Sequence, residues 1–550
     1  MAAMLKTTYQ KHFGKRPARL AEAVRNDGRK IKGPSGTLDV YTLPLNSHSM
    51  NIEGCKCFTF GKDSGKQNRT IMVIGGTGSG KTTLVNRMIN YILGVTAEDT
   101  FRFKLVDEGT AKSQAHSQTS EVNVYKLYHQ EGFQIDHSLT IVDTPGFGDT
   151  RGIERDELTV SQIETLFRAE HGVSEIDAIC FVAEASSARL TKTQKYVFDS
   201  VLKIFGNDVE ENIQIMVTFS DGNDPPVLEA IKVAQVPCPK GKDGLPIHFK
   251  FNNTVRKIPA ANNEDDTSDD DENEGDVDKL FWKKGNKSMA RFFSALHKIN
   301  PKSLTLTKQV LRERAQLQIS LENLRIKIKM ALTKHGEIKQ ESLILKAEES
   351  VIAVSGEFEY EVPVTRPAKL PGNKNSVNCK TCKVTCHKSC GVIWGLRYWC
   401  EVFTITGTCV QCKCGKSKHV LEGFYWGTET VTEKRTFKDL KIRYEEAYSA
   451  AMSVGDIITK MQLEYQQLLE EAVRLIERSA QCLNTLKKIA LRPDPLSTSD
   501  YIDMLIEEEK SKEKPGYLEI IETLEGLKTN ANTKEKVSPG VGTSPSAKNK

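Results

Sequence analysis

A chain of 550 residues has room for about three to five domains of ordinary size. Its 77 Lys and Arg exceed its 72 Asp and Glu by only five, so the composition gives no support for a protein that coats nucleic acid. Its apolar runs are far shorter than the roughly 18–20 residues of a membrane span, and the basic segment 1–32 has no apolar signal core. We therefore expect a cytoplasmic protein.

Residues 1–66 are rich in Lys, Gly, Ser and Pro and show little hydrophobic periodicity. Only 57–60 has the pattern of a short strand. We predict a flexible basic N-terminal arm over 1–66.

The next region, 67–300, alternates strand-like apolar runs with amphipathic helical stretches. This order predicts an α/β domain with a mainly parallel sheet covered by helices on both faces. Within it, 262–278 is strongly acidic and is interpreted as a disordered insertion. Strands are predicted at 71–74, 122–127, 139–142, 178–182, 213–217 and 248–251, and helices at 81–92, 162–169, 191–205 and 283–298.

A glycine-rich segment follows the first predicted strand and opens the helix at 81–92. It has the Gly-x4-Gly-Lys-Ser/Thr pattern in the strand–loop–helix setting that phosphate binding requires. Its backbone amides can point at phosphate oxygens, Lys81 can reach the β- and γ-phosphates, and the Thr82 hydroxyl can ligate Mg²⁺. The residues predicted to bind nucleotide here are Gly75, Gly78, Ser79, Gly80, Lys81, Thr82 and Thr83.

A second phosphate motif, Asp-Thr-Pro-Gly, begins where the strand at 139–142 ends. Asp143 is predicted to hold Mg²⁺ through water, and the Gly146 amide to sense the γ-phosphate. A hydroxyl just before the strand at 122–127 can complete the metal shell while triphosphate is present. Thr119 is the preferred residue, with Ser117 and Ser120 as alternatives. Lys81, Thr119 and Gly146 are accordingly the predicted catalytic residues.

The strand at 213–217 leads into Thr-Phe-Ser-Asp, which we interpret as the base-reading motif. A carboxylate at Asp221 can accept hydrogen bonds from N1–H and the exocyclic amine of guanine, a donor pair that adenine lacks. Thr218 belongs to the same motif, and Asn253 after the next strand is predicted to support the base edge.

These motifs resemble the paraseptin branch of GTPases, which contains septins, immunity-associated nucleotide-binding proteins and chloroplast outer-envelope import receptors. Asp-Thr-Pro-Gly-Phe-Gly-Asp at 143–149 looks like the septin form of the second phosphate motif, and the motifs at 218–221 and 251–253 look like the immunity-associated form. The resemblance covers about 70–300 and implies a three-layer P-loop G domain. The chain departs from Asn/Thr-Lys-x-Asp proteins at Phe219, whose ring can stack on the base in place of a Lys stem.

A second departure concerns hydrolysis. Small regulatory GTPases orient water with a Gln directly after this motif, whereas this chain has Phe147. We therefore predict slow turnover by a monomer, with the missing group supplied by Asp149, Arg151 or a second subunit. Related G domains often associate face to face through their nucleotide sites, which agrees with this prediction.

Two long stretches carry heptad patterns and predict long helices at 303–350 and 428–491. The alternatives are ordinary amphipathic helices in a bundle and a true coiled coil, formed as a hairpin within one chain or between chains. The tail, 492–550, is polar and is predicted to be largely disordered.

Eight of the thirteen cysteines lie between 379 and 414, within a predicted module at 351–427. Thiolate pairs two residues apart suit tetrahedral Zn²⁺, whereas disulfides or free thiols are the less favoured interpretations. Interleaved basic and aromatic residues could bind nucleic acid or a peptide, but in so small a module aromatics more often form the core. The ten candidate ligands, enough for two structural sites with the pairing open, are Cys379, Cys382, Cys386, His387, Cys390, Cys400, Cys409, Cys412, Cys414 and His419.

The sequence thus predicts a guanine-nucleotide-binding protein with Mg²⁺ and slow or dimer-dependent GTP hydrolysis, acting as a switch or assembly GTPase. Association as a homodimer or oligomer is expected through the G domain and coiled coil. The alternative is a nucleotide-bound scaffold whose helices and zinc module carry the interactions, and an ATPase is disfavoured by Asp221.

Overall fold

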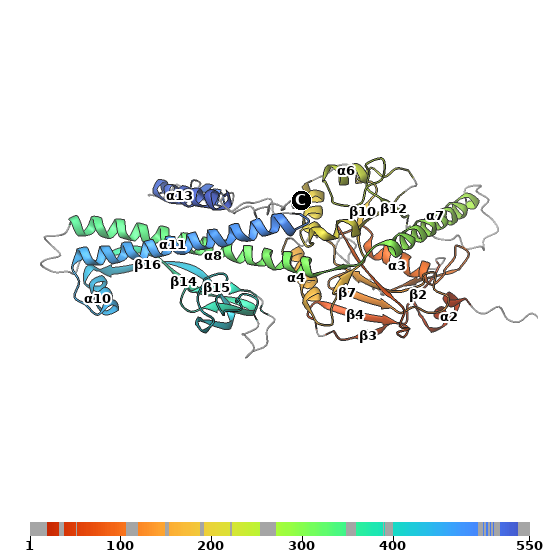
Figure 1. The fold of residues 1–550 in the computed structure, drawn as a ribbon, viewed down its shortest axis with the longest axis horizontal. Helices are drawn as coiled ribbons and strands as arrows, with labels where there is room; N and C mark the ends of the chain where they lie inside the picture. The colour runs from red at the N-terminus through yellow and green to blue at the C-terminus, as the bar shows by residue number, and fades with distance from the viewer. Residues whose placement is uncertain are drawn as a thin grey trace, which may run out of the picture. The chain divides into compact units, whose positions relative to one another are not determined.

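The computed structural model describes residues 19–31, 38–50, 52–105, 119–148, 153–187, 192–220, 223–252, 271–347, 359–388, 390, 400–492, 499, 502–503, 506–507, 510 and 517–536. The chain divides into two compact units. Unit 1 consists of Met1–Leu311 and Ile489–Arg492, and unit 2 of Arg312–Lys488 and Pro493–Lys550. Each unit is coloured by residue number in Figure 1.

Unit 1 is built on an eight-stranded sheet with the order β12-β11-β10-β5-β8-β7-β4-β3. Its central strands are almost wholly buried because their apolar side chains are covered on both faces. Strands β10, β11 and β12 are parallel to β5, and β8 is parallel to it on the other side, whereas β7 runs antiparallel to β8. The bounds are β3 Asn46–His48, β4 Cys55–Phe60, β5 Asn68–Gly75, β7 Val122–Leu127, β8 Ser138–Asp143, β10 Ala178–Glu184, β11 Ile213–Thr218 and β12 His248–Lys250.

Helices cover both faces of this sheet, which confirms the predicted α/β class. On one face, α3 and α7 bury side chains such as Leu84 and Phe292 in one hydrophobic cluster. On the other, α4, α5 and α6 bury Phe167, Val201 and Ile231 in a second cluster. The bounds are α3 Lys81–Ile92, α4 Ile153–Arg168, α5 Lys192–Leu202, α6 Val227–Val233 and α7 Asp271–Lys298, with the 3-10 helix η1 at Asn207–Asn212.

The predicted flexible arm at 1–66 is wrong for the described residues of that segment. Helix α2 (Leu20–Asp27) buries Ala21 and Val24, and β1 (Arg29–Ile31), β2 (Asp39–Thr42) and β6 (Phe101–Lys104) form a small sheet. Strand β4 joins the large sheet through parallel pairing with β7. These pairings join segments far apart in sequence, so local periodicity could not reveal them.

Helix α7 begins at Asp271, inside the predicted acidic insertion at 262–278. Residues 262–270 lie outside the described part of the chain, but the backbone of 271–278 is helical. Acidic residues are favoured in the first turns of a helix because its N-terminus carries a partial positive charge. The predicted insertion is therefore wrong for 271–278.

The chain leaves unit 1 along α8 (Thr305–Ala347) and returns to it after α11 (Val454–Ile489). The departing and the returning segment both contact Gly206. The Gly206 amide donates to the Thr307 hydroxyl at 3.2 Å, and Gly206 forms a β-bridge with Ala490. The returning segment is fixed further by an ion pair of 2.9 Å between Arg492 Nε and Asp199 Oδ1. A short strand pair, β9 (Glu175–Ile176) with β13 (Lys302–Ser303), precedes the departure.

Unit 2 contains a helical hairpin and a long β-ribbon. Helices α8 and α11, green and blue in Figure 1, run side by side, with Leu324 and Ile328 packed against Ala472 and Ile476. Lys327 Nζ lies 2.6 Å from Glu471 Oε2 across the pair. Of the pairings left open by the sequence, the one within a single chain is therefore observed.

The ribbon consists of β14 (Glu359–Cys379) paired antiparallel with β16 (His419–Thr436), and β15 (Val384–His387) adds a third strand at its end. Residues 428–436 belong to β16, so the predicted helix at 428–491 begins too early. Its helical part is divided into α10 (Phe437–Tyr448) and α11 by a break at Ser449, which has a φ of 52°. The short 3-10 helix η3 is Lys416–Lys418.

The predicted disorder of the tail at 492–550 is wrong for α13 (Tyr517–Lys536). Ile521, Leu524 and Leu527, three residues apart on one helical face, are buried in the cluster that holds Leu324 and Ile476. Residues 537–550 lie outside the described part. Among the described residues, no helix combines the length and apolar character needed to cross a membrane.

Candidate functional site

The glycine-rich loop joins β5 to α3 at the carboxyl edge of the sheet, as predicted. A side chain at Gly75 would collide with the Val182 carbonyl oxygen of the neighbouring strand. Gly80 has a φ of 83°, in the left-handed region, and an added Cβ would lie 3.3 Å from a ring carbon of Phe219. The loop therefore needs glycine at both ends, where the backbone passes closest to its neighbours.

Lys81, the first residue of α3, is buried beneath this loop. Its Nζ donates to the carbonyl oxygens of Gly75 at 3.2 Å and Gly76 at 2.8 Å. Burial lowers the pKa of Lys81 to about 8, and the nearby Asp143 carboxylate acts in the opposite direction. The site thus holds a poorly solvated cation, which a phosphate group would stabilise.

The three predicted magnesium ligands lie at this edge of the sheet. The Thr82 and Thr119 hydroxyl oxygens are 3.5 Å apart, and Asp143 ends the buried strand β8. The adjacent loop is fixed by Thr144, whose Oγ1 donates to the Val73 carbonyl at 2.9 Å. The alternative ligand Ser117 lies outside the described residues.

The second phosphate motif is bonded directly to the glycine-rich loop. The Thr77 amide donates to the Phe147 carbonyl at 2.8 Å, and the Phe147 amide donates to the Gly75 carbonyl at 3.1 Å. A Cβ at Gly146 would lie 2.5 Å from Thr77 Oγ1, so only glycine fits there. The Phe147 ring is fully buried in the core cluster and points into the protein.

Several polar atoms at this edge are buried without a hydrogen-bond partner among the described residues. They include Thr77 Oγ1 and Ser79 Oγ in the loop and Ser220 Oγ near the end of β11. An unpaired buried hydroxyl costs about 1–3 kcal/mol. A phosphorylated ligand supplies the hydrogen-bonding partners that these hydroxyls lack, so the residues present fit a nucleotide.

The segment expected to bind the base is hydrogen bonded to the glycine-rich loop. Thr218 Oγ1 donates to the Ser79 carbonyl at 2.7 Å, and the Ser220 amide donates to the Phe251 carbonyl at 3.0 Å. Phe219, with a φ of 51°, is 54% exposed and lies beside Gly80. A cavity of about 510 Å³ borders Ser220 and Phe251. The predicted base-reading residues Asp221 and Asn253 lie outside the described residues.

Two α4 residues that the sequence analysis missed contact the phosphate motifs. The Asp156 carboxylate accepts from the Gly148 amide at 3.0 Å, and Arg155 donates to the Ser120 carbonyl beside Thr119. Asp156 is 3% exposed. The sequence does show two charged residues, Arg155 and Asp156, soon after the 143–149 motif. Only the fold shows that both contact the phosphate motifs. The other residues offered for hydrolysis, Asp149 and Arg151, lie outside the described residues.

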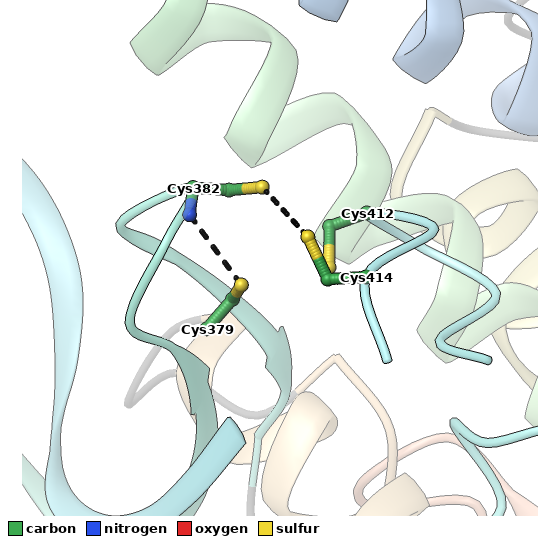
Figure 2. A group of neighbouring side chains, drawn as sticks. All are labelled: Cys379, Cys382, Cys412 and Cys414. Atoms are coloured by element: carbon green, nitrogen blue, oxygen red, sulfur yellow. Dashed lines mark hydrogen bonds between the residues drawn. The ribbon is translucent and has the colours of Figure 1, made fainter. Parts of the chain in front are cut away.

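All ten predicted metal ligands fall into three groups in unit 2, with donor atoms within 4.8 Å of one another in each group. The sequence analysis expected at most two sites. Figure 2 shows the thiols of the first group around a common space, with Cys382 and Cys414 sulfurs 3.4 Å apart. The groups are Cys379, Cys382, Cys412 and Cys414; Cys386, Cys409, Cys412 and His419; and His387, Cys390 and Cys400.

The histidines of these groups are oriented as metal ligands require. His387 Nδ1 lies 3.0 Å from Cys400 Sγ, while its Nε2 lies 3.6 Å from Glu401 Oε1. A ligand histidine commonly has such an acceptor at its second nitrogen. The remaining donors are thiols, which as thiolates are ligands that Zn²⁺ prefers. The donor chemistry therefore fits Zn²⁺.

Comparison with protein families gives one match, in which residues 66–168 align with the family model described as Septin. This segment spans the glycine-rich loop, the second phosphate motif and α4. No curated protein matches the chain.

Among solved structures, the similar chains include Toc33 from Arabidopsis thaliana. A dimerization-deficient mutant is 16% identical over 41% of this chain and 85% of that chain, with a TM-score of 0.25. Toc33 in complex with Mg²⁺ and GMPPNP is 16% identical over 41% of this chain and 86% of that chain, with a TM-score of 0.25. A third structure comes from work on the importance of dimerization for the GTPase activity of the chloroplast translocon components atToc33 and psToc159. It is 16% identical over 41% of this chain and 84% of that chain, with a TM-score of 0.26. TM-scores this low do not establish a shared fold.

The septin match coincides with the two phosphate motifs of a mainly parallel α/β sheet. The chain therefore contains a septin-like P-loop GTPase domain.

Proposed function

We propose that the chain is a guanine-nucleotide-binding protein that hydrolyses GTP slowly alone and faster in a dimer. One observation carries the nucleotide-binding part of this proposal. The buried Lys81 ammonium, the Thr82 and Thr119 hydroxyls and the Asp143 carboxylate gather at the edge of the sheet where the glycine-rich loop turns. That combination suits a triphosphate and its metal ion.

Each residue then has a defined role. Lys81 binds the β- and γ-phosphates, and the amides of the loop from Gly75 to Thr83 surround them. Thr82, Thr119 and Asp143 would hold Mg²⁺, which neutralises charge on the phosphates when bound. The Gly146 amide contacts the γ-phosphate. Because the Thr77 and Phe147 backbones are hydrogen bonded, a change at the γ-phosphate reaches both motifs together.

Guanine selection is assigned to Asp221, supported by Thr218 and Asn253. Thr218 fixes the end of β11 to the phosphate loop through its bond to Ser79. The exposed ring of Phe219 beside Gly80 is placed to stack on a base.

A competition measurement tests the base preference. We expect fluorescent GTP bound to the full chain to be displaced by GTP far better than by ATP, and Asp221→Ala to remove that difference. Asp27→Ala is the control, because Asp27 is exposed at the end of α2 and lies outside the nucleotide motifs. An unchanged preference in Asp221→Ala would contradict the assignment.

Slow turnover follows from Phe147, because its buried ring cannot orient a water molecule. A residue from a second subunit would then supply the group that orients water. We expect the hydrolysis rate per molecule to rise with protein concentration. A fast rate that does not depend on concentration would contradict this mechanism.

A nucleotide-bound scaffold is the second candidate, favoured by the size of unit 2 and its metal-ligand groups. In it, zinc holds the β-ribbon and the helices carry the partners. Permanently bound GDP with no measurable turnover at any concentration would favour the scaffold over the switch.

A further inference from the structure

The first two metal-ligand groups share one residue, Cys412. Together they contain seven donors, six thiols and one imidazole. Two tetrahedral Zn²⁺ ions need four ligands each, and seven donors satisfy both when one thiolate binds both ions. We propose that unit 2 holds a binuclear zinc cluster in which Cys412 is the bridging thiolate.

The first ion lies among the thiols in Figure 2. Cys379 ends β14, and Cys382 follows it in a tight turn in which the Cys382 amide donates to Cys379 Sγ at 3.4 Å. Cys414 comes from the opposite segment, with its sulfur 3.4 Å from that of Cys382. These three thiols supply three ligands, and Cys412 supplies the fourth.

The second ion lies among Cys386, Cys409 and His419. His419 Nε2 is 3.2 Å from Cys412 Sγ, while Nδ1 is 3.1 Å from the Gly415 carbonyl oxygen. A proton on Nδ1 donated to that carbonyl leaves the Nε2 lone pair directed toward the metal. Cys412 is thus in contact with donors of both ions.

The two Cys-x2-Cys turns have the same local geometry. The Lys383 amide donates to the Cys379 carbonyl at 3.0 Å, and the Lys413 amide donates to the Cys409 carbonyl at 3.0 Å. Lys383 and Lys413 both have positive φ, 49° and 61°. A left-handed backbone at a lysine is strained in both turns, and metal binding by the preceding thiols accounts for its repetition.

The sequence around the cluster is rich in lysine, which suits a cluster with a net negative charge. Two Zn²⁺ ions leave about two negative charges on six thiolates. The buried Lys327, whose ammonium pairs with Glu471 at 2.6 Å, also donates from Nζ to the Cys382 carbonyl at 2.9 Å and so fixes the turn that holds Cys382. Further lysines adjoin the ligands in sequence, at positions 380, 383, 413, 416 and 418.

The third group, His387, Cys390 and Cys400, has no donor in common with the seven. The inference goes beyond the proposed nucleotide function and does not rest on it, because the cluster belongs to unit 2 and the nucleotide site to unit 1.

The test is ¹¹³Cd NMR of the full chain after replacement of its zinc. A bridging thiolate couples the two metal nuclei, so we expect two resonances of equal intensity that split each other. A metal ion at the third group would add an uncoupled resonance. Spectra with no mutually coupled pair would overturn the proposal.

Single substitutions give an independent readout. We expect Cys412→Ser to shift or remove both coupled resonances, Cys414→Ser to remove ligation at the first ion, and Cys409→Ser at the second. Native mass spectrometry should give two metal ions at the seven donors of the unmodified chain. A Cys412→Ser variant that alters only one resonance would contradict the bridge. If that variant does not fold, the coupling in the unmodified chain decides.

Discussion

The buried residues of unit 1 differ in kind from those at the end of the β-ribbon in unit 2. Unit 1 buries aliphatic and aromatic side chains on both faces of a sheet, with Phe167, Phe181 and Phe292 among the largest fully buried residues. The small core at the end of the β-ribbon of unit 2 consists mainly of cysteines. A non-directional hydrophobic core sustains unit 1 and also the helices of unit 2, whereas we propose that metal ligands with defined geometry sustain the end of the ribbon.

Buried polar contacts join the helices of unit 2 to its cysteine-rich segments. In unit 2 the Ser320 hydroxyl donates to Gln411 Oε1 at 2.8 Å, and Asn323 Nδ2 donates to the Thr385 carbonyl at 2.7 Å. These bonds join α8 to the cysteine-rich segments. Since each buried polar group loses its partner if the packing shifts, they fix the alignment of the ribbon on the helix.

Removal of metal should affect the amide protection of the two units very differently, and this is the largest effect we expect. We expect a strong chelator to abolish the protection of amides in β15 and the ends of β14 and β16 while the sheet of unit 1 stays protected, because structural zinc contributes on the order of 10 kcal/mol to folding. Hydrogen–deuterium exchange measures both regions in one sample. Loss of protection in β5 and β10 to the same extent would show that the units do not differ in this way.

Replacement of Lys81 tests whether the buried charge in unit 1 contributes to nucleotide binding and not to the stability of the fold. We expect Lys81→Ala to weaken GTP binding by about 100-fold, since hydrogen bonds to charged groups contribute about 1.5–3 kcal/mol each. The melting temperature of the ligand-free chain should change little, because the cost of burying the Lys81 ammonium, which lowers its pKa, opposes the two hydrogen bonds to Gly75 and Gly76 that the substitution removes. Lys195→Ala, an exposed lysine paired with Asp199, is the control. A lowered melting temperature for Lys81→Ala would indicate a structural role.

The pH dependence of unit 1 should depend on His137. Burial lowers the pKa of His137, while its hydrogen bond to Asp136 acts in the opposite direction and the charges of Arg69 and His297 add to the lowering. The neutral form is favoured on folding, so its stability contribution is present above about pH 6.5 and is lost as pH falls through the lower folded pKa.

The expected slope is at most about 1.4 kcal/mol per pH unit, measured by denaturant unfolding across pH 5–7. His137→Gln should flatten it, whereas His171→Gln at the surface should leave it unchanged. Equal slopes in His137→Gln and the unmodified chain would refute the assignment.

The smallest expected effect concerns a helix start in unit 2. Thr436 and Asp439 form a reciprocal capping box, in which the Asp439 amide donates to Thr436 Oγ1 at 3.1 Å. Thr436→Ala should lower the free energy of unfolding by about 1 kcal/mol. The exposed Thr459→Ala on α11 should change it by less than about 0.5 kcal/mol. Equal effects would mean that the cap contributes nothing specific.

The sequence predicts local features of this molecule well. The bounds of α3 at Lys81–Ile92 and of β7 at Val122–Leu127 match their predicted ranges. Both follow from short apolar patterns that each segment carries by itself. The glycine-rich loop was predictable for the same reason, because its chemistry lies in consecutive residues.

Features that depend on distant pairing were not predictable. Strand β14 contains Pro363, Pro367 and Pro371, which argue against a strand in the interior of a sheet. A two-stranded ribbon tolerates them because each strand has one unpaired edge. Likewise, the sequence named all ten candidate ligands, eight cysteines and two histidines, but only their arrangement in space showed that Cys412 belongs to two groups.

The contacts of Thr307 and Ala490 with Gly206 bring the two ends of residues 312–488 together, and the rest of unit 2, from Pro493 on, follows the return of the chain. Since Thr307 and Ala490 both contact that glycine, residues 312–488 begin and end at nearly the same place on unit 1. A short linker across this gap would close the G domain without stretching its backbone.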